Sequence, residues 1–147
     1  NALLGVGGSL SITSNPKLNS IDGFAQLEKV GAFFNITSNQ TLYFIRGFSS
    51  LRIIALAMNI SANVSMMTLE GLTALRKVDE FILASNYALL SMKPLLDIEQ
   101  VTGPVIFITS NFEMPQCEAD AFVTRMRASG FDGDVTSDAN NTQKTCE

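Results

Sequence analysis

Ile12-Thr13-Ser14-Asn15 is the first of five similar four-residue stretches, and the spacing between them decides the fold. The other four are Ile36-Thr37-Ser38-Asn39, Ile60-Ser61-Ala62-Asn63, Leu83-Ala84-Ser85-Asn86 and Ile108-Thr109-Ser110-Asn111. Their asparagines are separated by 24, 24, 23 and 25 residues, so the short step and the long step cancel. Self-similarity at such a period is typical of a solenoid, in which each repeat forms one coil and stacks on the next.

Apolar residues recur at fixed offsets from each asparagine. The positions five and three residues before it are always apolar, as Phe34 and Ile36 are before Asn39. Residues two apart lie on one face of a β-strand. After the asparagine the apolar period is three, without the paired stripe of a helix, and Gly47 or Pro94 interrupts it. We therefore predict a mainly β fold: a parallel β-solenoid of about five 24-residue coils, with strands of successive coils roughly 4.8 Å apart.

The repeated asparagines have a structural explanation. A turning backbone inside a solenoid leaves N–H and C=O groups without partners, and each such buried group costs about 1–3 kcal/mol. An asparagine side chain offers both a donor and an acceptor, so it can satisfy the turn and stack on its neighbour. We predict a buried asparagine ladder. Its members are Asn15, Asn39, Asn63, Asn86 and Asn111.

The two ends of the repeat region differ. We expect one solenoid domain over residues 1–147, with repeats in 1–116 and a C-terminal cap in 117–147. Leu3 matches Leu27 in the repeat, so the sequence opens inside a coil and the N-terminal end of the solenoid is incomplete. A terminal coil needs protection of its edge and core. We therefore expect a fragment or processed piece, with missing repeats or another chain covering this coil.

The C-terminal cap is expected to contain a helix and a disulfide. Residues 118–129 have acidic residues in the first turn, an apolar face and Gly130 as a stop signal. Cys117 occupies an inward column, and Cys146 lies near the end of a polar tail. A bond between them would close a loop of about 30 residues, contribute roughly 3–4 kcal/mol and indicate an oxidising compartment. Two free thiols are the alternative.

The repeat resembles the receptor L-domain family, the leucine-rich-repeat-like solenoid of insulin and epidermal growth factor receptor ectodomains, and similar repeats of microbial and fungal surface proteins. The resemblance covers residues 3 to about 117 and includes Leu10-Ser11-Ile12, Asn15 and the apolar columns after it. The helix and cysteine pair also look like the C-terminal end of microbial L-domain-like proteins. The receptors' cysteine-rich modules are absent, so the resemblance implies a cell-surface module without a growth-factor receptor role.

Composition argues against several classes of function. The net charge is −4 and the ten Lys and Arg residues are scattered, which disfavours nucleic-acid binding. No apolar run is long enough for a membrane span, and no signal peptide is present, so an exported protein would already have lost it. The chain has no histidine and two cysteines, so Ser-His-Asp catalysis and a usual zinc site are unavailable to it. We expect no enzyme, cofactor or metal.

The positions seven residues after the asparagines form a charged column. Its members are Asp22, Arg46, Glu70 and Lys93. We interpret this column as a surface ion-pair ladder, in which each pair contributes about 0–1 kcal/mol, with a catalytic carboxylate pair as the alternative.

The outward face of the predicted sheet carries the candidate contact surfaces. Five N-x-S/T sequons occur, and the three outside the predicted ladder are the glycosylation candidates: Asn35, Asn59 and Asn140. The small hydroxyl residues on this face suggest ice binding as a distant alternative, which glycans at Asn35 or Asn59 would oppose. Towards the C-terminus the same face and the turns after it carry four large apolar residues: Ile82, Tyr87, Phe107 and Phe112.

These four residues form either an exposed partner patch or a surface covered by the tail at residues 131–145. The leading hypothesis is a non-catalytic, secreted or cell-surface binding or adhesion module that uses the exposed sheet face for a protein or glycan partner. The alternative is a structural component of a larger cell-surface or cell-wall assembly.

Overall fold

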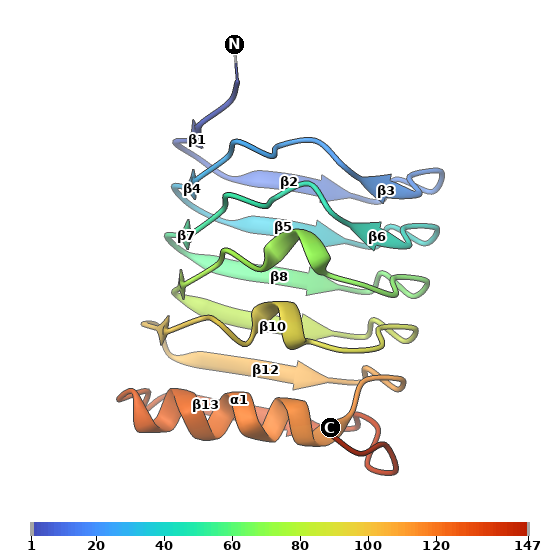
Figure 1. The fold of residues 1–147 in the computed structure, drawn as a ribbon, viewed down its shortest axis with the longest axis vertical. Coiled ribbons are helices and arrows are strands. Elements are labelled where there is room, and N and C mark those ends of the chain that lie inside the picture. The colour runs from blue at the N-terminus through green and yellow to red at the C-terminus, as the bar shows by residue number, and fades with distance from the viewer. Residues whose placement is uncertain (1, 147) are drawn as a thin grey trace.

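The computed structural model describes residues 2–146 and shows a mainly β solenoid of about four turns with one C-terminal helix (Figure 1). The main sheet has six parallel strands: β2 (Leu10–Thr13), β5 (Phe34–Thr37), β8 (Ala57–Ser61), β10 (Glu80–Ala84), β12 (Val105–Thr109) and β13 (Asp134–Asp138). The parallel solenoid is confirmed, whereas the expected count of about five coils is too high. Five repeat strands bound only four complete turns, because helix α1 (Gln116–Ala128) follows β12.

Shorter elements complete each turn. A five-stranded parallel sheet consists of β1 (Gly5–Val6), β4 (Lys29–Val30), β7 (Ile53–Ile54), β9 (Lys77–Val78) and β11 (Gln100–Val101). A two-stranded sheet contains β3 (Ser20–Ile21) and β6 (Phe44–Ile45). The third and fourth turns carry single 3₁₀ turns instead, η1 (Glu70–Leu72) and η2 (Lys93–Leu95). The period of three after each asparagine thus produces turns and short strands, as expected.

The apolar columns form one continuous core between these sheets. Ile36, Ile60, Leu83 and Ile108 stand at matching positions and are fully buried. The main-sheet register pairs Ile36 with Ile60 and Leu83 with Ile108, so each coil covers the side chains of its neighbour. This stacking buries apolar surface that no single coil could bury alone.

The unequal steps of the repeat are absorbed at one corner. Ile53 pairs with Lys77 at a separation of 24 residues, but Met58 pairs with Phe81 at 23. One turn later Val78 pairs with Val101 at 23, whereas Phe81 pairs with Ile106 at 25. The deletion that shortens one repeat and the insertion that lengthens the next therefore both lie in the corner that leads into the main sheet. The apolar columns on either side of this corner stay aligned.

The recurring glycines mark close approach between coils. A Cβ added at Gly47 would lie 2.0 Å from the carbonyl oxygen of Gly23, and one at Gly71 would lie 2.5 Å from the backbone of Arg46. Backbone atoms cannot move aside as a flexible side chain can. The column needs glycine because successive backbones pack directly against each other here.

Replacing Gly47 with alanine is expected to lower the free energy of unfolding by about 2–3 kcal/mol, because the added methyl group collides with the backbone of Gly23 in the preceding coil. Gly23 provides a matched control, since it occupies the same column in the first turn and a Cβ there meets no atom within 4 Å. Gly23→Ala should change stability by less than about 1 kcal/mol. Urea unfolding of both variants checks the difference, and equal losses would contradict the close-approach explanation.

Helix α1 closes the C-terminal end of the core. It begins at Gln116, two residues earlier than expected, and its buried Ala119, Phe122 and Met126 face the last coils. The Phe122 ring lies 4.5 Å from that of Phe81. The buried carboxylate of Glu118 accepts hydrogen bonds from the Ser91 hydroxyl and the Met92 backbone N–H, which fastens the helix to η2.

The tail after the helix becomes part of the solenoid. Strand β13 pairs in parallel with β12 and extends the main sheet at its edge. A disulfide joins Cys117 to Cys146, with their Cα atoms 6.0 Å apart, so the predicted pairing is confirmed. The interpretation that the tail folds over the sheet face is wrong, because β13 lies in the plane of the sheet and Tyr87 and Phe112 stay exposed.

Candidate functional site: the turn edge of the solenoid

The turns that follow the main sheet are positioned by the asparagine ladder. Each ladder asparagine sends its backbone N–H and its Nδ2 to the Oδ1 of the asparagine one coil later, as Asn39 does to Asn63 at 3.1 Å in both cases. From Asn39 onwards the same Nδ2 also donates to a main-chain carbonyl of the preceding coil, which is Ile12 for Asn39 at 2.9 Å, whereas Asn15 Nδ2 donates to Thr13 in its own coil. The four internal members are wholly buried.

The residue before each of these asparagines has a positive φ, as Ser38 does at 57°. This left-handed residue ends the strand and directs the following asparagine inward. The ladder therefore holds every turn of the edge in the same orientation. Asn15, at the open end, is the exposed exception to the expected burial.

Asn140 is a sixth member of the ladder. Its Oδ1 accepts from Asn111, and its Nδ2 donates to Gln116 Oε1 at 3.0 Å and to the carbonyl of Ile108. Asn140 is buried, and the nitrogen to which a glycan would be attached is occupied by these two hydrogen bonds. The folded structure thus disfavours Asn140 as a glycosylation site. Asn35 and Asn59 lie on the outward face of the main sheet, where they pair in register.

The four residues of the predicted partner patch lie in two pairs. Ile82 and Phe107 are in register on β10 and β12 and are half-buried. Tyr87 and Phe112 lie in the following turns, where their rings stack with centroids 5.0 Å apart and planes 21° apart. Within each pair the residues are brought together, and the row of Ala84 and Thr109 separates one pair from the other along the strands.

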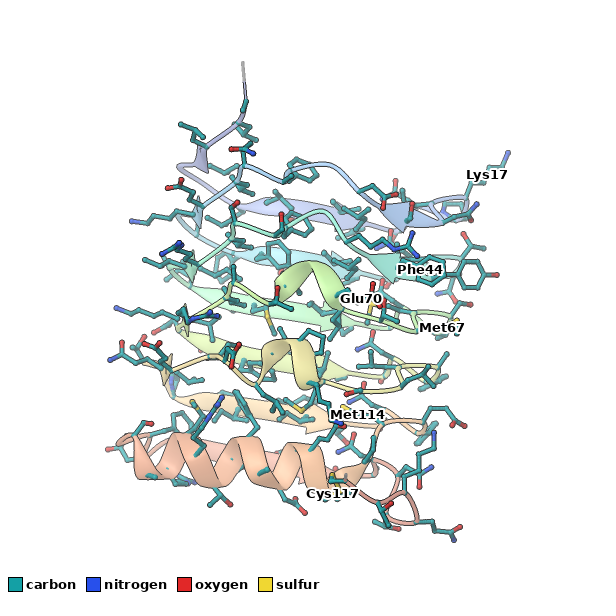
Figure 2. All side chains as sticks on the ribbon, viewed as in Figure 1. Lys17, Phe44, Met67, Glu70, Met114 and Cys117 are labelled. Carbon is teal, nitrogen blue, oxygen red and sulfur yellow. A yellow bond between two sulfur atoms is a disulfide. The ribbon has the colours of Figure 1, made fainter. Side chains whose placement is uncertain are left out.

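A second apolar column lies on the same turns, four residues after the asparagines, and sequence reasoning missed it. It consists of Tyr43, Met67 and Leu90, and the Met67 and Leu90 backbone N–H groups donate to the carbonyls of Tyr43 and Met67 at 2.9 and 3.2 Å. Figure 2 shows Met67 at this edge of the molecule. We call these three residues together with Tyr87 and Phe112 the turn edge. Its members are between 37% and 51% exposed.

A groove of about 140 Å³ runs between two turns of this edge, bounded by Met67, Leu90 and Pro94. Thr68 lines it, and among residues 2–146 its buried hydroxyl has no hydrogen-bond partner. Because that hydroxyl is buried, the surface that the groove offers to a partner is mainly apolar, although Glu70 is also among the lining residues.

Two members of the charged column contact groups outside the column. Arg46 lies over the ring of Phe44, 4.2 Å from its centroid, and Asp22 accepts a hydrogen bond from Ser20. Within residues 2–146 no three His, Cys, Asp or Glu side chains are grouped so that they could hold a metal ion.

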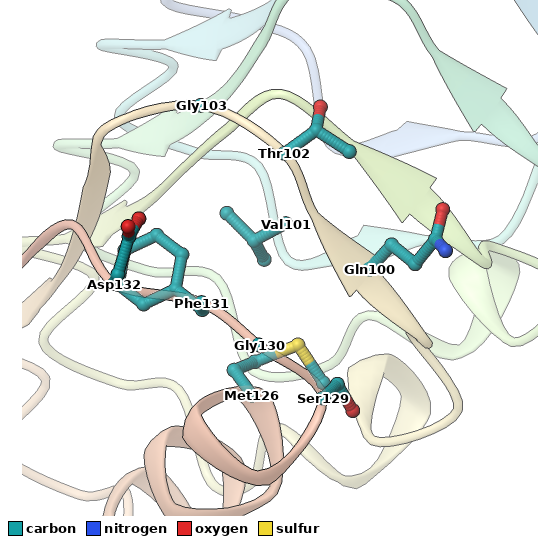
Figure 3. A pocket seen from close by; sticks show the side chains of 9 residues that line it. All are labelled: Gln100, Val101, Thr102, Gly103, Met126, Ser129, Gly130, Phe131 and Asp132. Carbon is teal, nitrogen blue, oxygen red and sulfur yellow. The ribbon is translucent and has the colours of Figure 1, made fainter.

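The hollow in Figure 3 lies between β11 and the C-terminal end of α1 and has a volume of about 240 Å³. Its polar side chains include Gln100, Thr102 and Ser129, and Asp132 is its single carboxylate. A lone carboxylate with no second titratable side chain beside it is not an acid–base pair. The turn edge is therefore the stronger candidate for a functional surface.

Comparisons with protein-family models, with curated proteins and with solved structures gave no match to this chain. Over the described residues, none of the helices combines the length and the apolar character needed to cross a bilayer.

Proposed function

We propose that this chain is a non-catalytic binding module of a secreted or cell-surface protein and that the turn edge is its contact surface. The main support is a set of five large, exposed apolar side chains on neighbouring turns of one rigid edge. Scattered exposed apolar residues need no explanation, but a contiguous group is typical of an interaction site. The Cys117–Cys146 disulfide favours an oxidising compartment. The two sequons on the outward sheet face and the resemblance to the receptor L-domain family, with its helix and cysteine cap, agree with that location.

The geometry favours a protein partner over a glycan. Sugars bind aromatic side chains through a free ring face. Here the rings of Tyr87 and Phe112 stack on each other, which leaves at most one face of each ring available to a sugar. The groove bounded by Met67, Leu90 and Pro94 on the same edge could receive an apolar side chain, as the pockets of protein interfaces do.

A display experiment can test this function without a known partner. Peptides selected from a random display library on the immobilised chain are expected to carry apolar anchors. Phe112→Ala should weaken their binding about thirtyfold, in line with a hot-spot loss near 2 kcal/mol. Phe33→Ala is the matched control, because Phe33 is an equally exposed aromatic residue elsewhere on the surface.

A glycan array probed with the same labelled chain distinguishes the two classes of partner. We expect no saturable glycan signal. Peptides that bind the Phe112→Ala variant as tightly as the wild-type chain, or glycans that bind in a Tyr87-dependent manner, would contradict the proposal. Circular dichroism and urea unfolding establish that each variant keeps its fold.

The distant ice-binding alternative is weakened by the sheet face, since its column changes from Ser11, Asn35 and Asn59 to Ile82 and Phe107. A flat and regular array of hydroxyl groups therefore does not extend along this face.

A further inference from the structure

The corner between β11 and the cap lacks a hydrogen bond that other corners of the solenoid have. In three earlier coils, the carbonyl of the valine that ends the short strand accepts a bond from the following coil. The donor and acceptor pairs are Gly31 and Val6, Ala55 and Val30, and Thr102 and Val78, at 2.7, 2.9 and 3.0 Å. Val101 ends the short strand of the last regular coil and pairs in register with Val78, so its carbonyl is the next acceptor in this series.

The end of helix α1 takes the donor that this next bond would need. The register of β12 and β13 places Phe131 where Thr102 stands one coil earlier. Gly130 has a φ of 100°, and the Phe131 N–H turns back to the Met126 carbonyl at 3.0 Å. This is the longer bond of the Schellman motif, which ends many helices at a glycine. The motif therefore removes the N–H that would otherwise reach Val101.

The backbone of Val101 is left without a partner on this side of β11. The Gln100 and Thr102 N–H groups donate to carbonyls of the preceding coil. Successive residues of a parallel strand bond alternately to its two sides, so the N–H and carbonyl of Val101 point towards the cap. Among residues 2–146 no group bonds to either of them. Because Val101 is only 7% exposed, these unpaired groups call for a ligand or ordered water.

The hollow of about 240 Å³ shown in Figure 3 lies at this position. Val101, Met126 and Phe131 are all buried and supply its apolar lining. β11 lies on one side of the hollow and the end of α1 on the other, so both of its sides are built by the interior of the chain. The hollow is therefore a feature of the junction between the last coil and the cap.

The polar groups that line the hollow are mainly acceptors. The Thr102 hydroxyl donates its proton to Asp79 Oδ1 at 3.1 Å. The Ser129 hydroxyl donates its proton to the Arg125 carbonyl at 3.0 Å. Each hydroxyl therefore offers a ligand only its lone pairs. Together with the unpaired Val101 carbonyl, they select a ligand that carries several hydrogen-bond donors.

The charges around the hollow favour a cation. Asp132 contributes a carboxylate, and the C-terminal end of the 13-residue helix α1 carries a partial negative charge. Among residues 2–146 no lysine or arginine lines the hollow. The nearby Arg127 lies over the Phe131 ring, 5.0 Å from its centroid, and donates to the Phe131 carbonyl. No basic side chain of the chain itself therefore neutralises the lining.

We propose that this hollow binds a primary ammonium group on an aliphatic stem, which is the chemistry of a lysine side chain or of a small alkylamine. The ammonium group donates to the Val101 carbonyl and the Asp132 carboxylate, and a hydrogen bond between ionised groups is the stronger kind. The stem packs against Met126 and Phe131. The inference does not depend on the function proposed for the turn edge, which lies on a different part of the surface.

Three small probes test the proposal on the whole chain: n-butylammonium chloride, N-acetyl-lysine methylamide and N-acetyl-norleucine methylamide. The norleucine compound keeps the aliphatic stem of lysine and lacks the ammonium group. We expect saturable NMR shift changes at the amides that line the hollow with both cationic probes, at a salt concentration that screens diffuse attraction. The norleucine compound should bind at least about tenfold more weakly than the lysine compound.

The two cationic probes distinguish the two sources of the ammonium group. The lysine compound carries peptide groups that can pair with the Val101 N–H, so hydrogen exchange at this amide should slow about tenfold if the natural ligand is a polypeptide. Tighter binding of the lysine compound than of n-butylammonium would agree with that source. Equal affinity and an unchanged exchange rate would identify a free amine, and either result supports the ammonium site.

Variants of the chain test the same contact from the protein side. Asp132→Asn should weaken binding of the lysine compound about tenfold, whereas the matched Asp97→Asn, at an exposed carboxylate outside the lining, should leave it unchanged. Ser129→Trp should fill the hollow and abolish binding, with urea unfolding as the check on its fold. Equal binding of the lysine and norleucine compounds, or equal losses in the two aspartate variants, overturns the proposal. The absence of saturable shifts with either cationic probe also overturns it, because the hollow would then hold water only.

Discussion

Asn63→Ala is expected to lower the free energy of unfolding by about 4 kcal/mol, because it removes a side chain with four buried hydrogen bonds. The Asn63 side chain accepts from the N–H and Nδ2 of Asn39 and donates to the Ile36 carbonyl and Asn86 Oδ1. Each buried group left without a partner costs about 1–3 kcal/mol, reduced by local relaxation. Urea unfolding under non-reducing conditions measures the loss.

Asn15→Ala is the matched control, because Asn15 makes the same kind of contact at the exposed end of the ladder. Water can replace its partners there, so we expect a loss of about 1 kcal/mol or less. Similar losses for the two variants would show that the ladder contributes through packing alone. A loss for Asn63→Ala below that of an ordinary surface substitution would contradict the structural assignment of the asparagine column.

Most of the solenoid can be predicted because the apolar residues and asparagines that determine each coil recur in the sequence at a fixed spacing. Ile12 and Ile36 stand 24 residues apart, and they pair in register on β2 and β5. A column of this kind needs no knowledge of distant contacts, since every coil has the same neighbours. The burial of Asn39 and Asn63, and with it their unsuitability as glycan acceptors, follows from the same repetition.

The 24-residue period does not predict the structure of the residues that follow its last regular repeat. Asn140 is 29 residues after Asn111, because helix α1 occupies the outer side of that winding. The sequence alone therefore indicates a glycosylation candidate in a polar tail, where the structure has a buried ladder residue. Gln116, which ends the ladder, belongs to no repeat column. Contacts of this kind are made once only, and only the tertiary structure brings their residues together.

The turn edge is partly visible in the sequence. The apolar pattern indicates Tyr87 and Phe112 but not Tyr43, Met67 and Leu90, although these three share one offset from the ladder. Their column begins with the polar Asn19, so it is not apolar throughout. Its exposure depends on turn geometry, since the residues one position earlier, Leu42 and Leu89 among them, point into the core. Aligning the repeats and looking for large apolar residues at outward-facing turn positions could have identified this column.

The second large effect concerns the Cys117–Cys146 disulfide. Replacing both cysteines with alanine is expected to lower the free energy of unfolding by about 3–4 kcal/mol, because the closed loop spans 29 residues of sequence and restricts the unfolded chain. Reduced wild-type protein is the matched control and should lose the same amount. Chemical denaturation with and without reductant measures both.

The same substitution should leave strand β13 in place. Five residue pairs join β13 to β12, and Asn140 and Asn141 bond to Gln116 and Met114 without help from the disulfide. Hydrogen exchange should therefore accelerate only in residues 142–146, while the amides of β13 stay protected. Loss of protection throughout β13 would show that the disulfide holds the last strand on the solenoid. An unchanged free energy of unfolding would mean instead that the unfolded chain is already compact near its C-terminus.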